Sequence, residues 1–256
     1  MVRSRPRGSG VPLELVSTLL LLLAWQVLAM VFPGRLFPTP VEVAIQLWKL
    51  TFFGKLVPDM GKTLTRAAIS FTVAMAIGIT VGILFGRVRA ADRLFSSWVI
   101  VGLNLPAVVI AIVLYIWLGL TETALILAVI INKVPLVITT IREGVRSFNH
   151  DYDEVGQAFR MPLVRRLRLI FVPQLMPYVL AAARTGLALI WKIVLVFEVI
   201  GSDGGVGFRI NTMFQFFDIT GILAYTTAFI LVVLVFEYWI MRPLEHSVLR
   251  WRTDRV

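Results

Sequence analysis

The sequence predicts an all-α polytopic membrane protein with six transmembrane helices. Hydrophobic residues make up 58% of the 256 residues, charged residues make up only 16%, and the apolar residues are gathered in long runs. Soluble globular domains contain roughly 45–50% apolar and about 25% charged residues. A helix of about 20 apolar residues spans about 30 Å, which is the thickness of the hydrocarbon core of a bilayer.

The first run extends from Leu13 to Phe32 and contains one charge, Glu14, at its edge. It is longer than the apolar core of a cleaved signal peptide, and the sequence VFPGRLFPTP that follows has no clear cleavage site of small residues. We therefore interpret this run as the first transmembrane helix, with a signal peptide as the less favoured alternative.

Five further runs complete the predicted set. The runs at 94–118 and 123–141 contain Pro106 and Pro135, which membrane helices tolerate where neighbouring groups satisfy the freed carbonyls. The run Phe171–Ile200, which is the fifth span of the chain, is too long for one straight crossing, so its first turns are expected in the membrane interface. The five runs are Thr63–Gly86, Leu94–Leu118, Thr123–Ile141, Phe171–Ile200 and Thr220–Met241.

The distribution of positive charges predicts the orientation. Six crossings place both termini on one side, and sixteen of the 25 Lys and Arg residues fall in the loops and termini of that side, against five on the other. Cytoplasmic loops carry the excess of Lys and Arg, so both termini and the segment 142–168 are predicted to be cytoplasmic. Since these charges flank apolar spans, the net charge of +10 indicates contact with anionic lipid and not with nucleic acid.

Between the first two spans, the sequence TPVEVAIQLWKLTFF has apolar residues at helical spacing. This stripe predicts an amphipathic helix on the outer membrane surface, with a plain linker as the alternative. The apolar positions are Val41, Ala44, Ile45, Trp48 and Phe52.

Patterns for catalysis, nucleotide binding and metal binding are missing from the sequence. The chain has no cysteine, and neither His150 nor His246 has a second ligand at metal spacing. The sequence MGKT, which ends at Thr63, resembles the end of a phosphate-binding loop, but Leu56 stands where that loop requires a glycine. We therefore predict no enzyme activity, no cofactor and no metal, and expect a partner to supply the energy for any uphill transport.

Glycines are frequent in two places. The stretch GSDGGVGFRIN, residues 201–211, is predicted to be an outer loop whose glycines adopt positive φ in tight turns. In the second span, Ala74, Gly78, Gly82 and Gly86 recur every four positions. This pattern of small residues predicts close packing against another helix.

Polar residues inside the spans are candidates for lining a translocation path, because an ionisable group near the bilayer centre costs about 2.5–3.5 kcal/mol. Hydrogen bonding between helices, or snorkelling near a span end, is the alternative for each of them. An ion pair between Lys133 and Glu198, which lie on two different predicted helices, is a further alternative. The candidates are Asn104, Asn132, Lys133, Lys192 and Glu198.

The cytoplasmic segment contains a spaced motif. Its pattern resembles the signature E-A-A, three residues, G, nine residues, I-x-L-P of binding-protein-dependent ABC importer permeases, with identities at Glu154, Ile170 and Pro173. The departures are Val155 and Gly156 for the two alanines, Arg160 for the glycine and Val172 for the leucine. The resemblance covers roughly residues 60–245. Within the family, the stretches 66–122 and 197–208 are similar to the nitrate/sulfonate/taurine class.

The resemblance implies a type I ABC importer permease fold and a coupling helix that docks on a cytoplasmic ATPase. Glu154 is expected near the start of that helix, where the macrodipole favours an acid. An apolar contact face is expected to enter a groove of the ATPase, and a solvated loop is the alternative. The implied coupling residues are Glu154, Val155, Gly156, Ala158, Phe159, Arg160, Met161 and Pro173.

The resemblance also implies the partners and the cargo. The partners are cytoplasmic ABC ATPase subunits, a periplasmic or other extracytoplasmic substrate-binding protein, a second copy of the chain and the bilayer of a bacterial inner membrane. The cargo is a small, often anionic nutrient such as a sulfonate or nitrate. An ATP-independent channel or secondary transporter is the alternative function. The expected organisation is an N-terminal part, 1–62, a core permease domain, 63–245, with a coupling segment at 143–170, and a cytoplasmic tail, 246–256.

Overall fold

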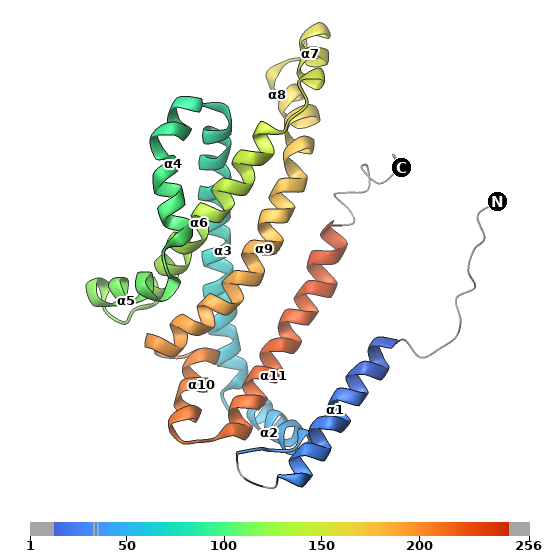
Figure 1. The fold of residues 1–256 in the computed structure, drawn as a ribbon, viewed down its shortest axis with the longest axis vertical. Helices are drawn as coiled ribbons and strands as arrows, with labels where there is room; N and C mark the ends of the chain where they lie inside the picture. Colours follow the sequence, from blue (N-terminus) through green and yellow to red (C-terminus); the bar gives the residue numbers. More distant parts are fainter. Residues whose placement is uncertain (1–12, 33, 35, 246–256) are drawn as a thin grey trace, which may run out of the picture.

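The protein is helical throughout the residues that the computed structural model describes, which are 13–32, 34 and 36–245. Figure 1 shows an elongated bundle of helices, and no strand occurs in this part of the chain. The elements are α1 (Leu13–Val31), α2 (Pro40–Phe52), α3 (Leu56–Arg87), α4 (Arg89–Asn104), α5 (Ala107–Leu118), α6 (Glu122–Arg146), α7 (His150–Ala158), α8 (Leu163–Arg166), the π-helix η1 (Leu167–Phe171), α9 (Val172–Gly201), α10 (Val206–Gln215), α11 (Ile219–Phe236) and the π-helix η2 (Glu237–Met241).

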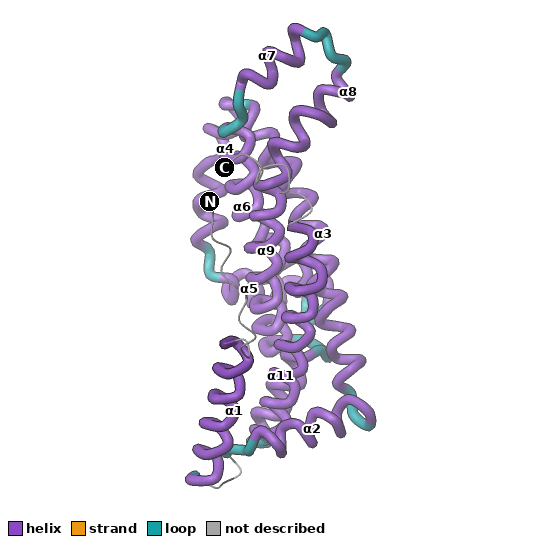
Figure 2. The backbone as a smooth tube through the Cα atoms, turned by 90° about the vertical axis from the view of Figure 1, so that its right-hand side faces the viewer, coloured by secondary structure: helices purple, strands orange, loops and turns teal. Residues whose placement is uncertain are grey.

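The core of the bundle is formed by α3, α6 and α9, with α11 beside them. Helices α3 and α6 run in the same direction, and α9 returns in the opposite direction (Figure 1). Helices α7 and α8 lie at one end of the long axis, and α2 and α10 lie at the other. Figure 2 shows α7 and α8 projecting beyond the rest of the bundle.

The predicted close packing of the small residues in α3 is confirmed. Gly78 lies against Val137, and Gly82 lies against Ile141, both on α6. A Cβ atom added at Gly82 would lie 2.7 Å from the Cβ of Ile141 and 2.9 Å from the carbonyl oxygen of Ile138. The two parallel helices therefore approach closely only because these α3 positions have no side chain.

The span predicted at 94–118 is not one continuous helix. Helices α4 and α5 are bent by 95° relative to each other at the break around Pro106. Proline has no N–H to donate and disfavours helical geometry in the residue before it. Leu105 is accordingly extended, with φ −67° and ψ 125°. The prediction that neighbouring groups would keep this proline inside one helix is wrong.

Two π-turns precede prolines. In the first, the N–H of Val172 donates to the carbonyl of Leu167, five residues earlier, immediately before Pro173. A π-turn is wider than an α-turn, so the helix continues although the proline nitrogen has no hydrogen to donate. The second turn, η2, precedes Pro243 in the same way. Residues 163–201 thus form one helical segment of 39 residues, here called the α8–α9 helix. That its first turns lie in the membrane interface stays a prediction.

Four helical segments of the described chain are long and apolar enough to cross a membrane, or five if the bent pair α4–α5 counts as one span. Helix α1 contributes a shorter apolar stretch, Val16–Val31. It stands apart from the bundle in Figure 1 and contacts α2. The indole N–H of Trp25 donates to the carbonyl of Pro38, just before α2, at 3.1 Å. The protein is therefore a multi-pass membrane protein, and the sixth crossing stays a prediction.

The amphipathic segment predicted between the first two spans is a helix, α2. Thr39 and Glu42 form a reciprocal capping box at its start, in which each side chain accepts a hydrogen bond from the backbone N–H of the other. This arrangement satisfies two backbone donors that the first turn of a helix leaves unpaired.

Candidate functional site

The segment that carries the spaced motif begins with α7. Asn149 caps this helix by accepting a hydrogen bond from the backbone N–H of Asp151 at 2.9 Å. The cap starts the helix at His150, so Glu154 is its fifth residue and lies beyond the first turn. The prediction that Glu154 lies near the helix start is therefore wrong, and Asp151 is an acid in the turn where the macrodipole acts.

Helix α7 ends in a left-handed turn at Arg160, which has φ 46°. The N–H of Arg160 donates to the carbonyl of Gln157, and the N–H of Met161 donates to that of Gly156, both at 2.9 Å. These two bonds define a Schellman motif, whose left-handed position is usually glycine. The turn thus keeps the geometry expected for glycine, although a left-handed backbone costs a residue such as arginine about 1–2 kcal/mol.

The two faces of α7 have different surroundings. Gly156 is buried on one face, where an added Cβ would lie 3.0 Å from Ile170 and 3.5 Å from the aliphatic part of Arg166. The side of α7 that carries Val155 and Phe159 is uncovered, with Val155 exposed and Phe159 exposed to 74%. Among the other predicted coupling residues, Glu154, Ala158 and Arg160 are exposed, and Met161 and Pro173 are half-buried.

The polar residues predicted for a translocation path lie in several environments. Asn104 and Lys192 are exposed in the single chain, Asn132 is half-buried and Lys133 is buried. Asn104 donates to the carbonyl of Ile100 in its own helix. Within the described residues, no hydrogen bond or ion pair joins any two of the five candidates, and Lys133 has no ion pair. The suggested Lys133–Glu198 pair is therefore absent.

Glu198 instead lies in a buried polar cluster near the end of the bundle opposite α7. Its carboxylate accepts hydrogen bonds from Arg66 Nη1, Thr63 Oγ1 and the N–H of Gly207, each at 2.9 Å. The side chains of Arg66 and Glu198 are 2% and 0% exposed. A buried charge is tolerated only when it is paired and hydrogen-bonded, and both charges here meet that condition.

The cluster ties five helices together. Arg66 also donates to Glu122 at 2.8 Å, to Asp203 at 3.1 Å and to the carbonyl of Gly204 at 2.7 Å. Nearby, Asp59 accepts hydrogen bonds from Arg209 Nε at 2.7 Å and from the Tyr225 hydroxyl at 3.0 Å. The members come from α3, α6, α9, α10 and α11, together with the turn between α9 and α10.

The turn between α9 and α10 differs in part from the predicted loop. Gly205 has φ 102°, which confirms the expected use of positive φ by a glycine. The second half of the predicted loop is helical, because α10 begins at Val206. Gly207 therefore lies in a helix, where its N–H reaches Glu198.

Most of this cluster was missed by sequence reasoning, which started the second span at Thr63 and left Asp59 in an outer loop. Asp59, Thr63 and Arg66 are spaced by four and three residues, so they share one face of a helix. This spacing could have indicated that the helix begins before Thr63 and has a polar face.

Comparisons with known proteins agree with the resemblance. A family model described as "Binding-protein-dependent transport system inner membrane component" matches residues 74–248. The putative aliphatic sulfonates transport permease protein SsuC of Bacillus subtilis is 25% identical, over 90% of this chain and 84% of its own length. The bicarbonate transport system permease protein CmpB of Synechococcus elongatus is 30% identical, over 83% of each chain. The nitrate import permease protein NrtB of Synechocystis is 28% identical, over 76% of this chain and 74% of its own.

Solved structures show the same fold. A chain from inward-facing conformations of the MetNI methionine ABC transporter superposes with a TM-score of 0.62 at 17% identity. The match covers 75% of this chain and 95% of that chain. At this identity the likeness concerns the fold alone.

Proposed function

This chain belongs to the family of binding-protein-dependent transport system inner membrane components, and we propose that it forms the translocation path of an ATP-driven importer for a small anionic nutrient. Relatives named for aliphatic sulfonates, bicarbonate and nitrate support an anionic cargo. The observation that carries the proposal is the uncovered apolar face of α7, which projects beyond the bundle at the position of the family motif.

In this proposal, α7 receives the movement of a cytoplasmic ATPase. The exposed face with Val155 and Phe159 enters a groove on the ATPase, as an amphipathic helix does in a helix-in-groove contact. The buried position on α7 is Gly156, which packs on Ile170 of the α8–α9 helix. Because that helix runs without a break to Gly201, a displacement of α7 moves a rigid element that reaches the opposite end of the bundle.

The proposed assembly contains two copies of this chain, two ATPase subunits and an extracytoplasmic substrate-binding protein. Both termini and α7 lie on the cytoplasmic side of a bacterial inner membrane, as the positive charges predict. The path lies along the two-fold axis between the copies. Asn104 and Lys192, which are exposed in the single chain, are the better placed candidates to line it, beside Asn132 and Lys133. The cluster around Glu198 holds the outer ends of the helices together.

The test uses two variants of α7 and one matched control. Phe159→Ala removes an exposed aromatic ring, whose complete burial in a partner would contribute about 2–4 kcal/mol. Glu154→Lys reverses a charge at an exposed position of the same helix. The control is Phe216→Ala, because Phe216 is exposed to 79% and follows α10 at the opposite end of the bundle.

Each variant is purified from cells that also produce the ATPase subunit, and retention of that subunit is measured beside ATP hydrolysis stimulated by the loaded binding protein. Phe159→Ala and Glu154→Lys should insert normally but lose both retention and stimulation. Phe216→Ala should retain the ATPase like the wild type. Wild-type retention and stimulation in both α7 variants would show that α7 is not the coupling element.

A further inference from the structure

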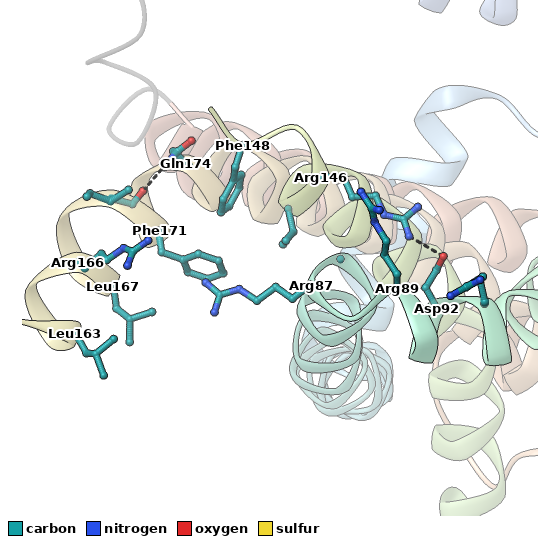
Figure 3. A pocket seen from close by; sticks show the side chains of 14 residues that line it. Arg87, Arg89, Asp92, Arg146, Phe148, Leu163, Arg166, Leu167, Phe171 and Gln174 are labelled. Atoms are coloured by element: carbon teal, nitrogen blue, oxygen red, sulfur yellow. Dashed lines mark hydrogen bonds and ion pairs between the residues drawn. The ribbon is translucent and has the colours of Figure 1, made fainter. Parts of the chain in front are cut away.

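A basic cavity of about 1080 Å³ lies between the α3–α4 turn and the α7 end of the bundle. Figure 3 shows side chains from both sides reaching into it. Asp92 is the one carboxylate among the described residues that line it. The lining arginines are Arg87, Arg89, Arg93, Arg146 and Arg166.

The carboxylate of Asp92 neutralises only part of this surface, because it is engaged by Arg146 and by Arg142, and Arg142 does not line the cavity. Its Oδ1 accepts a hydrogen bond from Arg142 at 3.0 Å, and its Oδ2 accepts one from Arg146 at 2.6 Å. Arg89 and Arg93 have no carboxylate partner in the part of the chain that the structure describes. Guanidinium groups without a carboxylate are suited to phosphate, which accepts paired hydrogen bonds in their fork geometry.

Arg87 connects the two sides of the cavity. Its guanidinium lies 4.3 Å from the centre of the Phe171 ring, a cation–π contact that holds the charge beside η1 (Figure 3). The cavity therefore lies between α3 and the first turns of the α8–α9 helix. A ligand bound here would contact both the core of the bundle and the helix on which α7 packs.

One wall of the cavity is apolar. Leu163, which is 76% exposed, Leu167 and Ile170 come from α8 and η1. A free inorganic anion would use the arginines and leave these side chains uncovered. An amphiphilic ligand uses both kinds of surface, because its charged group meets the arginines and its hydrocarbon part covers the leucines.

We propose that this cavity binds the phosphate headgroup of an anionic phospholipid from the cytoplasmic leaflet, with Leu163 and Leu167 against the adjoining part of its acyl chains. Basic pockets between membrane helices on the cytoplasmic side are suited to such headgroups. The proposal rests on the orientation given under the proposed function. Lipid binding does not require the ATPase, so the lipid site and the coupling role of α7 can each be refuted without refuting the other.

The experiment measures lipid retained by the purified full-length chain. The protein is exposed to detergent micelles containing phosphatidylglycerol or phosphatidylcholine, and the bound lipid is counted by native mass spectrometry. The test variant replaces both arginines that lack a carboxylate partner, Arg89→Gln with Arg93→Gln. Arg242→Gln is the control, since Arg242 is exposed and does not line the cavity.

The wild type should retain phosphatidylglycerol in preference to phosphatidylcholine. The double variant should bind phosphatidylglycerol about 30-fold more weakly, if each arginine contributes about as much as one juxtamembrane basic residue. The control should bind like the wild type. Equal phosphatidylglycerol binding by the double variant and the wild type would overturn the proposal.

Two further arms separate the other sources of negative charge. Competition by inorganic phosphate or glycerol phosphate at the affinity of the lipid would overturn the lipid assignment in favour of a soluble anion. Loss of the bound lipid when the ATPase subunit is added would identify an acidic surface of that subunit as the occupant, and would also overturn it. Retention of the lipid in both arms supports a headgroup site.

Discussion

Glu198 and Glu237 each meet an arginine at 2.9 Å, but the two pairs differ in burial. Glu198 is 0% exposed and binds Arg66, which is 2% exposed. Glu237 is 32% exposed and binds Arg184, which is 48% exposed. Replacing either glutamate by alanine removes the same chemical group. We expect the two losses of stability to differ, because the Glu198 pair is buried and the Glu237 pair is partly exposed.

Glu198→Ala removes the carboxylate that accepts hydrogen bonds from three buried donors, namely Arg66 Nη1, Thr63 Oγ1 and the N–H of Gly207. Arg66 Nη1 keeps the carbonyl of Gly204 and Thr63 Oγ1 keeps that of Asp59, but the guanidinium loses its buried counter-charge. Breaking a buried ion pair by removing one partner costs about 3–5 kcal/mol. For a chain of this size, that corresponds to a fall of roughly 6–20 °C in the unfolding midpoint. Glu237→Ala should cost about 1 kcal/mol or less, because Arg184 keeps a second partner, Glu245, at 2.8 Å.

The assay is thermal unfolding of each purified variant in the same detergent, with a double variant as a further check. Arg66→Met with Glu198→Leu removes both buried charges together. It should be more stable than Glu198→Ala, since Glu122 and Asp203, the other partners of Arg66, are exposed enough to turn toward water. Equal midpoints for Glu198→Ala and Glu237→Ala would refute the reasoning.

Three further variants test other parts of the structure. Gly82→Ala should lower the unfolding midpoint, at a cost of about 1–3 kcal/mol, because its Cβ would overlap Ile141. Gly61→Ala, in open space on the same helix, should be neutral or slightly stabilising. Equal effects of the two variants would contradict the close packing of α3 on α6. Arg160→Gly should relieve about 1 kcal/mol of backbone strain and slow hydrogen exchange at the Met161 amide, and faster exchange would argue against the left-handed turn. In this cysteine-free chain, Lys192→Cys should react with a water-soluble thiol reagent in at least one nucleotide state of the assembled transporter, while the buried Val194→Cys stays protected. Protection of the cysteine at Lys192 in every state would exclude this residue from the path.

Hydrophobic patterning predicted most of the helices, because a long apolar run can satisfy its backbone in a membrane only as a helix. The break at Pro106 could not be predicted in this way. Pro106 and Pro135 look alike in sequence, but Pro135 stays inside α6 whereas Pro106 separates α4 from α5. The difference depends on packing against neighbouring helices, which a single sequence does not contain.

The spaced motif located α7 but not its exact start or the geometry of its end. The start depends on the capping residue Asn149, which lies five positions before Glu154, the residue from which the motif is counted, and therefore outside the motif. The turn keeps its left-handed geometry although Arg160 stands where the motif has glycine, because its two backbone hydrogen bonds and the packing of Gly156 define it. The partner of Glu198 was also beyond reach, because Arg66 is 132 residues away in the chain.

The subunit composition of the complex purified through a tag on this chain tests the central claim most directly. The measurement is the mass of the intact complex taken from its own membrane. The account predicts two copies of this chain with two copies of an ATPase subunit, and loss of the ATPase alone when Phe159 is replaced by alanine. A chain that purifies without any ATPase, or one that retains the ATPase unchanged after Phe159→Ala and Glu154→Lys, would contradict it.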